Sequence, residues 1–331
     1  MAPDISIVIP AYNVAGYIVP TLRSALAQRD VATEIIVVDD GSNDATPRIL
    51  EGFRAEPRLR VIRQLNQGLP AARNTGLAAA VGRHVGFLDG DDLWDPVKAR
   101  RHVDLLDRRP EIDLTYSWWR IIDDAGEVTG RHNTEPPERL LGGLSFEGLA
   151  IENFAGNGST VVCRREALLR AGGFDPALRA CEDLDAWLRV ALLREGNIAL
   201  VEEILTSYRM RGGQMTRDWQ RMLQGWEAAI GKARLRAPDR IAAVERMAMA
   251  RRNRFLAYIA YEAGDHAAAR GFILGAWRAS PRALLGDRRC WLVSSAVAVA
   301  SVLPRGLHEG LAATVKRHRA ERARLRATSA A

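Results

Sequence analysis

Residues 85–96 read VGFLDGDDLWDP, an apolar run followed by four aspartates within seven positions. The run ends at Asp89, and Asp91 and Asp92 follow after a single glycine. Carboxylates crowded in this way repel one another unless a positive group lies among them. The stretch therefore predicts a strand that carries acidic side chains to a cation at its carboxyl end.

Two interpretations of this acidic stretch stay open. Asp and Gly dominate turns, and an aspartate can cap a following helix, so the stretch could be only a turn. Alternatively, Asp89 and Asp91 offer two carboxylates with the small Gly90 between them, and Mg²⁺ and Mn²⁺ take carboxylate and phosphate oxygens as ligands. A second pair of carboxylates, Asp39 and Asp40, also follows an apolar run and favours the metal interpretation.

The first part of the chain alternates strand and helix patterns. Uninterrupted β-branched runs predict strands buried on both faces of a parallel sheet, and segments with helical spacing separate them. We expect strands at residues 5–9, 34–40, 60–63 and 84–89, and helices at residues 17–28, 45–53 and 69–80. This order favours an α/β fold with helices on both faces of a mainly parallel sheet. Such sheets bind ligands at the carboxyl ends of their strands, where both pairs of carboxylates lie.

Several other classes of site lack their sequence patterns. No GxGxxG follows a strand and no GxxxxGK[ST] occurs, which argues against dinucleotide-binding and P-loop sites. Residues 143–148, GLSFEG, carry Glu147 where the GxSxG of a hydrolase needs glycine. The three cysteines and six histidines show no metal-binding spacing, so neither a disulfide framework nor a zinc site is indicated.

The net charge indicates an anionic partner. The 331 residues carry a formal charge of +7, mostly from arginine, since Lys98, Lys232 and Lys316 are the only lysines. Phosphate, anionic lipid or nucleic acid would fit this charge. A nucleic-acid-binding protein is the weaker alternative, because the chain lacks interleaved aromatic and basic residues. The first residues lack the features of a signal peptide, so we expect a cytoplasmic protein.

Five motifs occur in the order and spacing typical of one enzyme family: SIVIPAYN (6–13), EIIVVDDGSNDAT (34–46), NQGLPAARNTGL (66–77), VGFLDGDDLWDP (85–96) and GGFDPALRACEDLDAWLRV (172–190). Over roughly residues 4–215 the chain resembles the family 2 glycosyltransferases. The resemblance implies a GT-A fold and inverting transfer of a sugar from a nucleotide-diphosphate donor, with UDP favoured. It also implies a glycosyltransferase domain at residues 1–215, with a nucleotide-sugar half (1–97) and an acceptor half (98–215), before a helical region at 216–331.

The resemblance implies roles for residues at the carboxyl ends of the predicted strands. We call this edge of the sheet, where the two pairs of carboxylates lie, the carboxylate edge. The residues that the resemblance implies in nucleotide binding are Pro10, Tyr12, Asp39, Asp40, Arg73, Asp89 and Gly90. Asp40 is the better candidate for reading the uracil imide, and Arg73 is placed near the nucleotide. Asp91, together with Asp89, is expected to hold Mg²⁺ or Mn²⁺.

The proposed chemistry needs a second acidic site. Displacement at an anomeric carbon requires a base for the acceptor proton and a cation for the departing diphosphate. The segment CEDLDAW, residues 181–187, supplies it. By resemblance Asp183 is the base, and Glu182 orients it or touches the acceptor. The structural alternative is that both acids only complement the dipole at a helix start.

One departure from the family pattern concerns Arg211. Many relatives have a histidine at this place, in a loop that closes on the diphosphate, whereas this chain reads SYRMRGGQMT at residues 207–216. An arginine can pair with phosphate but cannot bind a metal, so Arg211 is expected to stabilise the diphosphate by charge. The alternative is an ordinary surface arginine. The QxxRW pattern of processive synthases is missing after Gln220, which favours addition of a single sugar.

The C-terminal region carries helical patterns and a basic end. Residues 250–285 predict two helices joined at Gly264 and Asp265, with a stop at Pro281. The apolar run at 291–304 is shorter than the roughly 20 residues of a membrane span. Residues 316–326 hold six Lys or Arg against one acidic residue. We therefore consider an anionic membrane surface as a partner, which suits a glycan or lipid-linked acceptor.

A sugar nucleotidyltransferase remains the alternative enzyme class, because it shares the sheet. Such enzymes typically carry a Gly-rich loop with arginine and lysine after the first strand, whereas this chain has PAYNVAGY at residues 10–17. The two classes differ in the product released, a nucleoside diphosphate or pyrophosphate.

Overall fold

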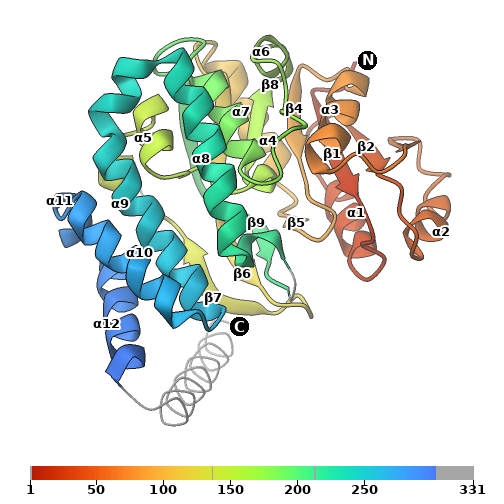
Figure 1. Ribbon diagram of the computed structural model, residues 1–331. Helices are drawn as coiled ribbons and strands as arrows, with labels where there is room; N and C mark the ends of the chain where they lie inside the picture. Colours follow the sequence, from red (N-terminus) through yellow and green to blue (C-terminus); the bar gives the residue numbers. More distant parts are fainter. Residues whose placement is uncertain (1, 136, 212–213, 303–331) are drawn as a thin grey trace, which may run out of the picture.

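The computed structural model describes residues 2–135, 137–211 and 214–302 (Figure 1). The strands are β1 (Ile5–Ala11), β2 (Thr33–Asp39), β3 (Leu59–Arg63), β4 (His84–Phe87), β5 (Leu93–Trp94), β6 (Leu114–Ile122), β7 (Val128–Asn133), β8 (Val161–Arg164) and β9 (Ile198–Arg209). The α-helices are α1 (Ile18–Leu26), α2 (Thr46–Glu51), α3 (Leu69–Ala79), α4 (Lys98–Arg108), α5 (Phe146–Ile151), α6 (Arg165–Arg170), α7 (Glu182–Ala191), α8 (Trp219–Arg236), α9 (Pro238–Glu262), α10 (His266–Ala279), α11 (Arg282–Leu285) and α12 (Arg288–Val302).

All strands belong to one sheet in the order β3-β2-β1-β4-β8-β6-β9-β5, with β7 beside β6. The first four strands pair in parallel, as the sequence predicts. Ala11 lies opposite Asp39 in the register, and the N–H of Leu88 donates to the carbonyl of Val8 (2.9 Å). The carboxyl ends of β1, β2 and β4 therefore meet at one edge.

The second half of the sheet is mixed rather than parallel. β8 runs antiparallel to both β4 and β6, and β5 runs antiparallel to β9, whereas β6 and β9 are parallel. This arrangement differs from the uniformly parallel pattern of the first half. It brings β5, which directly follows the acidic stretch, beside the end of β9.

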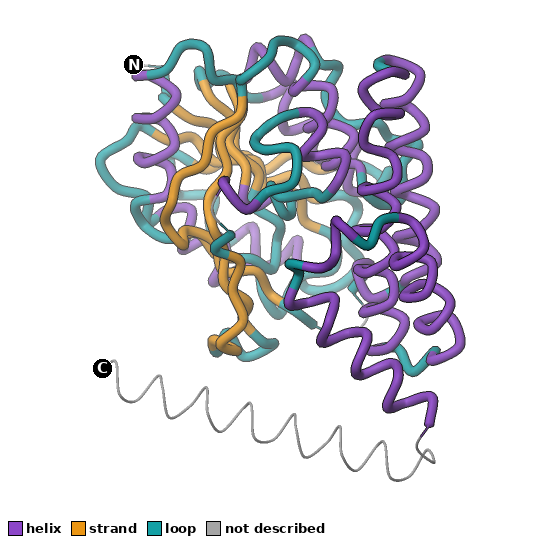
Figure 2. Tube along the Cα trace, turned by 90° about the vertical axis from the view of Figure 1, so that its left-hand side faces the viewer, coloured by secondary structure: helices purple, strands orange, loops and turns teal. Residues whose placement is uncertain are grey.

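Helices cover both faces of the sheet (Figure 2), and an apolar core lies on each face. Successive side chains of a strand point to opposite faces, and β1 shows this directly: Ile5, Ile7 and Ile9 pack with α1 and α4, whereas Val8 packs on the other face. Every residue of β1 is buried. The uninterrupted apolar run in the sequence thus reflects a strand covered on both faces.

The C-terminal helices pack into the core on the face of the sheet that contains Val8. Ala229, Ile230 and Ala233 of α8, with Ile241 and Val244 of α9, lie in the same cluster as residues of β4, β6, α5 and α7. In Figure 1, α8 and α9 run beside the helices that cover this face. The domain boundary at residue 215 stays a prediction, but this core crosses it.

The end of the described chain matches the expected helical pair. α9 and α10 are joined through Gly264 (φ +80°) and Asp265, whose side chain accepts from the N–H of Ala268 (3.0 Å). α10 ends at Ala279, just before Pro281. None of the helices in the described ranges is long and apolar enough to cross a membrane. The basic stretch 316–326 lies outside the described residues.

Candidate active site

The acidic stretch forms a turn after β4, and one of its carboxylates holds this turn in place. Asp92 is fully buried and accepts hydrogen bonds from Ser159 Oγ (2.6 Å), Asn157 Nδ2 (3.1 Å) and the N–H of Arg209 (2.9 Å). Burial and the neighbouring Asp91 raise the pKa of Asp92 well above its usual range. Asp92 therefore joins three chain segments, while Asp89 and Asp91 face the edge.

Gly90 packs closely against the end of β1. A Cβ at this position would lie 3.1 Å from both the carbonyl oxygen of Pro10 and Val14 Cγ2. The glycine between the two aspartates therefore lets the turn approach the end of β1. Pro10 contributes to the site through its backbone at this contact.

Arg73 links the carboxylate edge to the predicted catalytic acids. Its guanidinium is buried and donates from Nη2 to Asp89 Oδ1 (2.7 Å) and from Nη1 to Glu182 Oε1 (2.7 Å). A Cβ on Gly158 would lie 2.5 Å from Nη2, so only glycine fits over it. The resemblance implies that Arg73 lies near the nucleotide, and in the structure both terminal nitrogens of its guanidinium donate to carboxylates.

Asp183 lies beside this bridge but does not take part in it. Its Oδ1 accepts only from the N–H of Leu184 (2.7 Å), and no ion pair to Asp183 is found among the described residues. Burial, followed by the adjacent Glu182 carboxylate, raises the pKa of Asp183 to about 7. The preceding residue, Cys181, adopts a left-handed conformation (φ +57°) that L residues rarely take. A partly buried carboxyl with a pKa near neutrality suits a general base.

Arg211 contacts the predicted metal ligand. Its Nε lies 2.7 Å from Asp91 Oδ2, and its guanidinium lies 5.3 Å from the ring centroid of Tyr17. Arg209 contacts the other side of the turn through the carbonyl of Asp91 (2.8 Å) and also packs on Tyr17. The end of β9 therefore covers the acidic turn with two arginines, and Arg211 is not an isolated surface residue.

The residues predicted to bind the nucleoside lie along the same edge. Asp40 accepts from Gln64 Nε2 (2.7 Å) and Gln67 N–H (2.9 Å) at Oδ1, and from Gly68 N–H (2.8 Å) at Oδ2. A carboxylate offers about four acceptor positions, so Asp40 retains one, on Oδ2. Asp39 accepts from the N–H of Ser42 (3.0 Å).

Two further observations concern the nucleoside side of the edge. The second oxygen of Asp39 pairs with the exposed Arg63 (3.3 Å), so this carboxylate also shapes the loop after β2. Tyr12 follows β1 and is 47% exposed, which leaves its ring accessible to a ligand. The structure thus brings every predicted site residue to one edge of the sheet.

The carboxylates of the acidic turn fit a divalent cation. Burial and the Asp89 charge raise the pKa of Asp91, and Arg211 opposes this shift only in part. Excess negative charge at hard oxygen ligands favours Mg²⁺ or Mn²⁺. Within the described ranges, no group of three or more His, Cys, Asp or Glu is arranged to hold a metal alone. Two carboxylates would leave the remaining positions to phosphate oxygens and water.

Sequence reasoning missed the residues that support the site. Asn157 and Ser159 hold Asp92 across more than sixty positions, and no local pattern indicates that contact. The pairing of Arg73 with Glu182 spans 109 positions and is equally invisible in the sequence. Tyr17 lies at the start of a predicted helix, and only the fold shows that two arginines pack on its ring.

Comparisons with known proteins relate the chain to glycosyltransferases. Residues 6–170 match the family model described as glycosyl transferase family 2. An uncharacterised protein of Mycobacterium tuberculosis is 34% identical over 209 residues, which cover 62% of this chain and 58% of the relative. The chain therefore spans less than two thirds of that relative's length. TuaG of Bacillus subtilis, a glycosyltransferase named for teichuronic acid biosynthesis, is 29% identical over 68% of this chain and 86% of its own.

Two solved structures share the fold. The mannosyltransferase PcManGT from Pyrobaculum calidifontis, in complex with GDP-Man and Mn²⁺, superposes with a TM-score of 0.58 at 19% identity, over 98% of this chain and 87% of that one. S. aureus TarS 1–349 in complex with UDP-GlcNAc gives a TM-score of 0.55 at 19% identity, over 83% and 82%. These likenesses support the expected GT-A-like architecture with a helical C-terminal region.

Proposed function

Because the chain belongs to glycosyltransferase family 2, we propose that it transfers one sugar from a nucleotide-diphosphate donor to a glycan hydroxyl with inversion at the anomeric carbon. One observation carries the proposal. Asp183 is free of ion pairs among the described residues and has a pKa raised to about 7, whereas Arg73 holds both Glu182 and Asp89 beside it. A single available base beside an edge lined with carboxylates suits a direct displacement.

The donor is proposed to lie along the edge formed by β1, β2 and β4. Asp40 has one acceptor position left for an N–H of the base, and Tyr12 offers an exposed ring near the same strand end. We favour a uridine nucleotide, because an imide N–H is the donor that such a carboxylate can accept. The complex of TarS with UDP-GlcNAc supports this choice, while that of PcManGT with GDP-Man makes guanosine the alternative.

Asp91 and Asp89 are proposed to hold Mg²⁺ or Mn²⁺, which when bound neutralises charge on the diphosphate. For the metal to take Asp91 Oδ2, Arg211 has to leave its 2.7 Å contact with that oxygen. The freed guanidinium is then available to a phosphate oxygen, with which it can form paired hydrogen bonds. Arg211 would thus exchange one anionic partner for another.

Asp183 is proposed to take the proton of the acceptor hydroxyl. The hydroxyl oxygen forms the new bond to the anomeric carbon as the bond to the diphosphate oxygen breaks, and the proton moves to the Asp183 carboxylate. Glu182 cannot replace it while Arg73 holds its carboxylate at 2.7 Å. We propose that Glu182 and Arg73 position the loop that presents Asp183.

The acceptor is proposed to be an envelope or extracellular glycan, or a lipid-linked saccharide. The similarity to TuaG, which is named for teichuronic acid biosynthesis, supports a polysaccharide acceptor. We further propose a cytoplasmic protein that associates with an anionic membrane surface. Leu285, Trp291, Leu292 and Val299 are exposed along α11 and α12, and Trp291 is 50% exposed. Apolar side chains of this kind can enter the headgroup boundary.

Flotation with liposomes tests the membrane association. Binding should require anionic lipid, weaken as salt rises and be lost when the chain is truncated after Ser280. Equal flotation on neutral vesicles, or none at all, would contradict it.

The reaction class is tested by the product released. The protein is incubated with Mn²⁺ and UDP-Glc, UDP-GlcNAc, UDP-Gal or GDP-Man, and nucleoside diphosphate is followed over time. We expect UDP from at least one UDP-sugar through slow transfer to water, and none from the Asp91→Asn variant. Release of pyrophosphate from UTP and a sugar 1-phosphate would instead identify a nucleotidyltransferase.

A further inference from the structure

The segment that carries the proposed base packs against α8, a helix that lies beyond the residues matched by the family model. We call residues 179–183 the base loop. They lead into α7, which begins at Glu182, and α8 runs beside α7 (Figure 1). Whatever holds the first residues of the base loop therefore also holds the start of α7, where Asp183 lies.

Gly225 of α8 packs directly on the base loop. It is buried, and a Cβ at this position would lie 2.6 Å from the carbonyl oxygen of Ala180 and 2.8 Å from its Cβ. The nearest neighbour is backbone, which cannot rotate away as a long side chain can. Glycine weakens the interior of a helix relative to alanine, and here it allows the close approach of α8 to the loop.

The turn of α8 before Gly225 contacts the residues on either side of Ala180. Arg221 Nε donates to the carbonyl of Arg179 (2.9 Å). Cys181 Sγ lies 3.9 Å from the carbonyl oxygen of Met222. Three consecutive residues of the base loop therefore contact α8.

Lys232 extends this contact along α8 to α7 itself. Its Nζ lies 3.1 Å from Asp185 Oδ1 in the first turn of α7 and also contacts Asp175. Positions 221, 225 and 232 recur at helical spacing, so they share one face of α8. That face holds both the base loop and the helix that the loop begins.

Cys181 has a backbone conformation that needs support from its surroundings. Its φ of +57° lies in the left-handed region, which is unfavourable for residues other than glycine and persists where neighbouring structure holds it. On one side of it, Ala180 packs on Gly225. On the other side, Arg73 holds Glu182 at 2.7 Å. Contacts on both sides thus fix the turn into α7.

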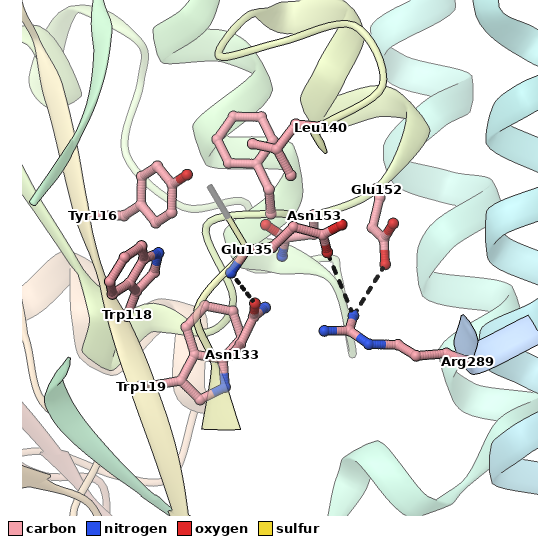
Figure 3. A pocket seen from close by; sticks show the side chains of 10 residues that line it. Tyr116, Trp118, Trp119, Asn133, Glu135, Leu140, Glu152, Asn153 and Arg289 are labelled. Atoms are coloured by element: carbon pink, nitrogen blue, oxygen red, sulfur yellow. Dashed lines mark hydrogen bonds and ion pairs between the residues drawn. The ribbon is translucent and has the colours of Figure 1, made fainter. Parts of the chain in front are cut away.

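Other contacts of the C-terminal helices involve different segments of the chain. Arg289 at the start of α12 lies 3.9 Å from both Glu135 and Glu152 (Figure 3), and Arg254 of α9 donates to Glu152 (2.6 Å). Neither carboxylate belongs to the base loop. Attachment of the C-terminal helices and support of the base loop can therefore be altered separately.

We infer that α8 is a positioning element for the transfer reaction, in which Gly225 and Arg221 set the place of the base loop and, through it, of the Asp183 carboxylate. The inference rests on the proposed function in taking Asp183 as the base. Both residues contact the backbone of the loop, so they act through it. The C-terminal region then contributes to the rate of transfer as well as to stability.

Two glycines of α8 provide a matched pair of variants in the full chain. A Cβ at Gly231 meets no atom within 4 Å, so Gly231→Ala is the control. Gly225→Ala should lower kcat for UDP release from a UDP-sugar about ten- to hundredfold, as expected for a small displacement of a catalytic group. The KM for the donor and the binding of UDP with Mn²⁺ should stay unchanged. Gly231→Ala should change none of the three quantities.

A second variant decides the matter if Gly225→Ala fails to fold. Arg221 is exposed, and Arg221→Ala removes its hydrogen bond to the carbonyl of Arg179. It should lower kcat by less than Gly225→Ala, again at unchanged KM. Arg289→Ala is its matched control, because it removes an arginine of the C-terminal helices from Glu135 and Glu152, and it should leave kcat unchanged. An equal fall in kcat for Arg289→Ala would contradict the inference.

Hydrogen–deuterium exchange tests the support of the base loop without any reaction. Amides of residues 179–185 should exchange faster in Gly225→Ala and Arg221→Ala than in Gly231→Ala. Unchanged exchange in both variants, or faster exchange with unchanged kcat, overturns the inference. If the unmodified chain releases UDP from no UDP-sugar, the proposed function is contradicted, and faster exchange in the variants still supports the role of α8 in holding the loop.

Discussion

Asp183 and Glu182 are neighbours in the chain but differ in their surroundings. Glu182 is held by Arg73 at 2.7 Å, while Asp183 accepts a single backbone hydrogen bond. Burial and the Glu182 charge favour the protonated form of Asp183, and the pKa of about 7 follows. This difference supports the proposal that Glu182 positions the loop and Asp183 accepts the proton.

Replacing the proposed base tests this proposal. Asp183→Asn keeps the shape but cannot accept a proton, so transfer should fall by roughly 10² to 10⁴ while donor binding survives. In the unmodified enzyme, kcat/KM should rise with pH up to about 7 and then level off, because the base must be deprotonated. Initial rates from pH 5 to 9 provide the measurement, with exposed Asp239→Asn as the matched control. Near-normal turnover of Asp183→Asn would move the base elsewhere.

Arg73 is expected to stabilise the fold as well as the site. Removal of one partner from a buried ion pair leaves an uncompensated charge and costs about 3–5 kcal/mol. Arg73→Met should lower the free energy of unfolding by an amount in that range, measured in urea. Adding Glu182→Gln should restore part of the loss, because it removes one orphaned carboxylate. Strictly additive effects of the two substitutions would show that they do not interact.

At the level of secondary-structure elements, the segment at the end of β9 contacts the acidic turn directly. Arg211 occupies Asp91 Oδ2 at 2.7 Å and so competes with any cation for that oxygen. Arg211→Ala should therefore strengthen Mn²⁺ binding in the absence of nucleotide and yet slow transfer, since the departing diphosphate loses a positive partner. Calorimetry with Mn²⁺ and initial rates measure the two effects. Exposed Arg217→Ala should change neither, and weaker Mn²⁺ binding by Arg211→Ala would refute the competition.

The strands differ in how far the sequence predicts them. β1, β2 and β4 follow from continuous apolar runs, which are typical of strands covered on both faces. β6 reads LTYSWWRII and pairs with β9 through two register shifts. Its polar residues and bulges break the period that a strand prediction uses, so only tertiary pairing explains it.

The sequence likewise predicts only part of the site. The motifs predict which residues gather at the edge, because parallel strands end together. They do not predict that Arg73 joins Asp89 to Glu182, or that Asn157 and Ser159 hold Asp92. These contacts depend on segments that are far apart in the sequence.

In the molecule as a whole, we expect the C-terminal helices to fold together with the sheet and its covering helices. Ile230 of α8 and Ile241 of α9 are buried in the core that α5 and α7 share. A chain that ends at residue 215 would expose this apolar surface, and we expect it to be insoluble or to lack a cooperative thermal transition. A chain that ends at residue 302 should melt cooperatively. Independent folding of residues 1–215 would establish the predicted boundary as a true domain border.

The acidic turn is proposed to bind a nucleotide through a divalent metal, separately from the base. Calorimetry of UDP binding with and without Mn²⁺, on the unmodified chain and on Asp91→Asn and Asp183→Asn, tests it most directly. We predict that UDP binds only with Mn²⁺, that Asp91→Asn abolishes this binding and that Asp183→Asn retains it. UDP binding that is equally strong without metal, or unchanged in Asp91→Asn, would contradict the account and leave residues 89–92 as a turn.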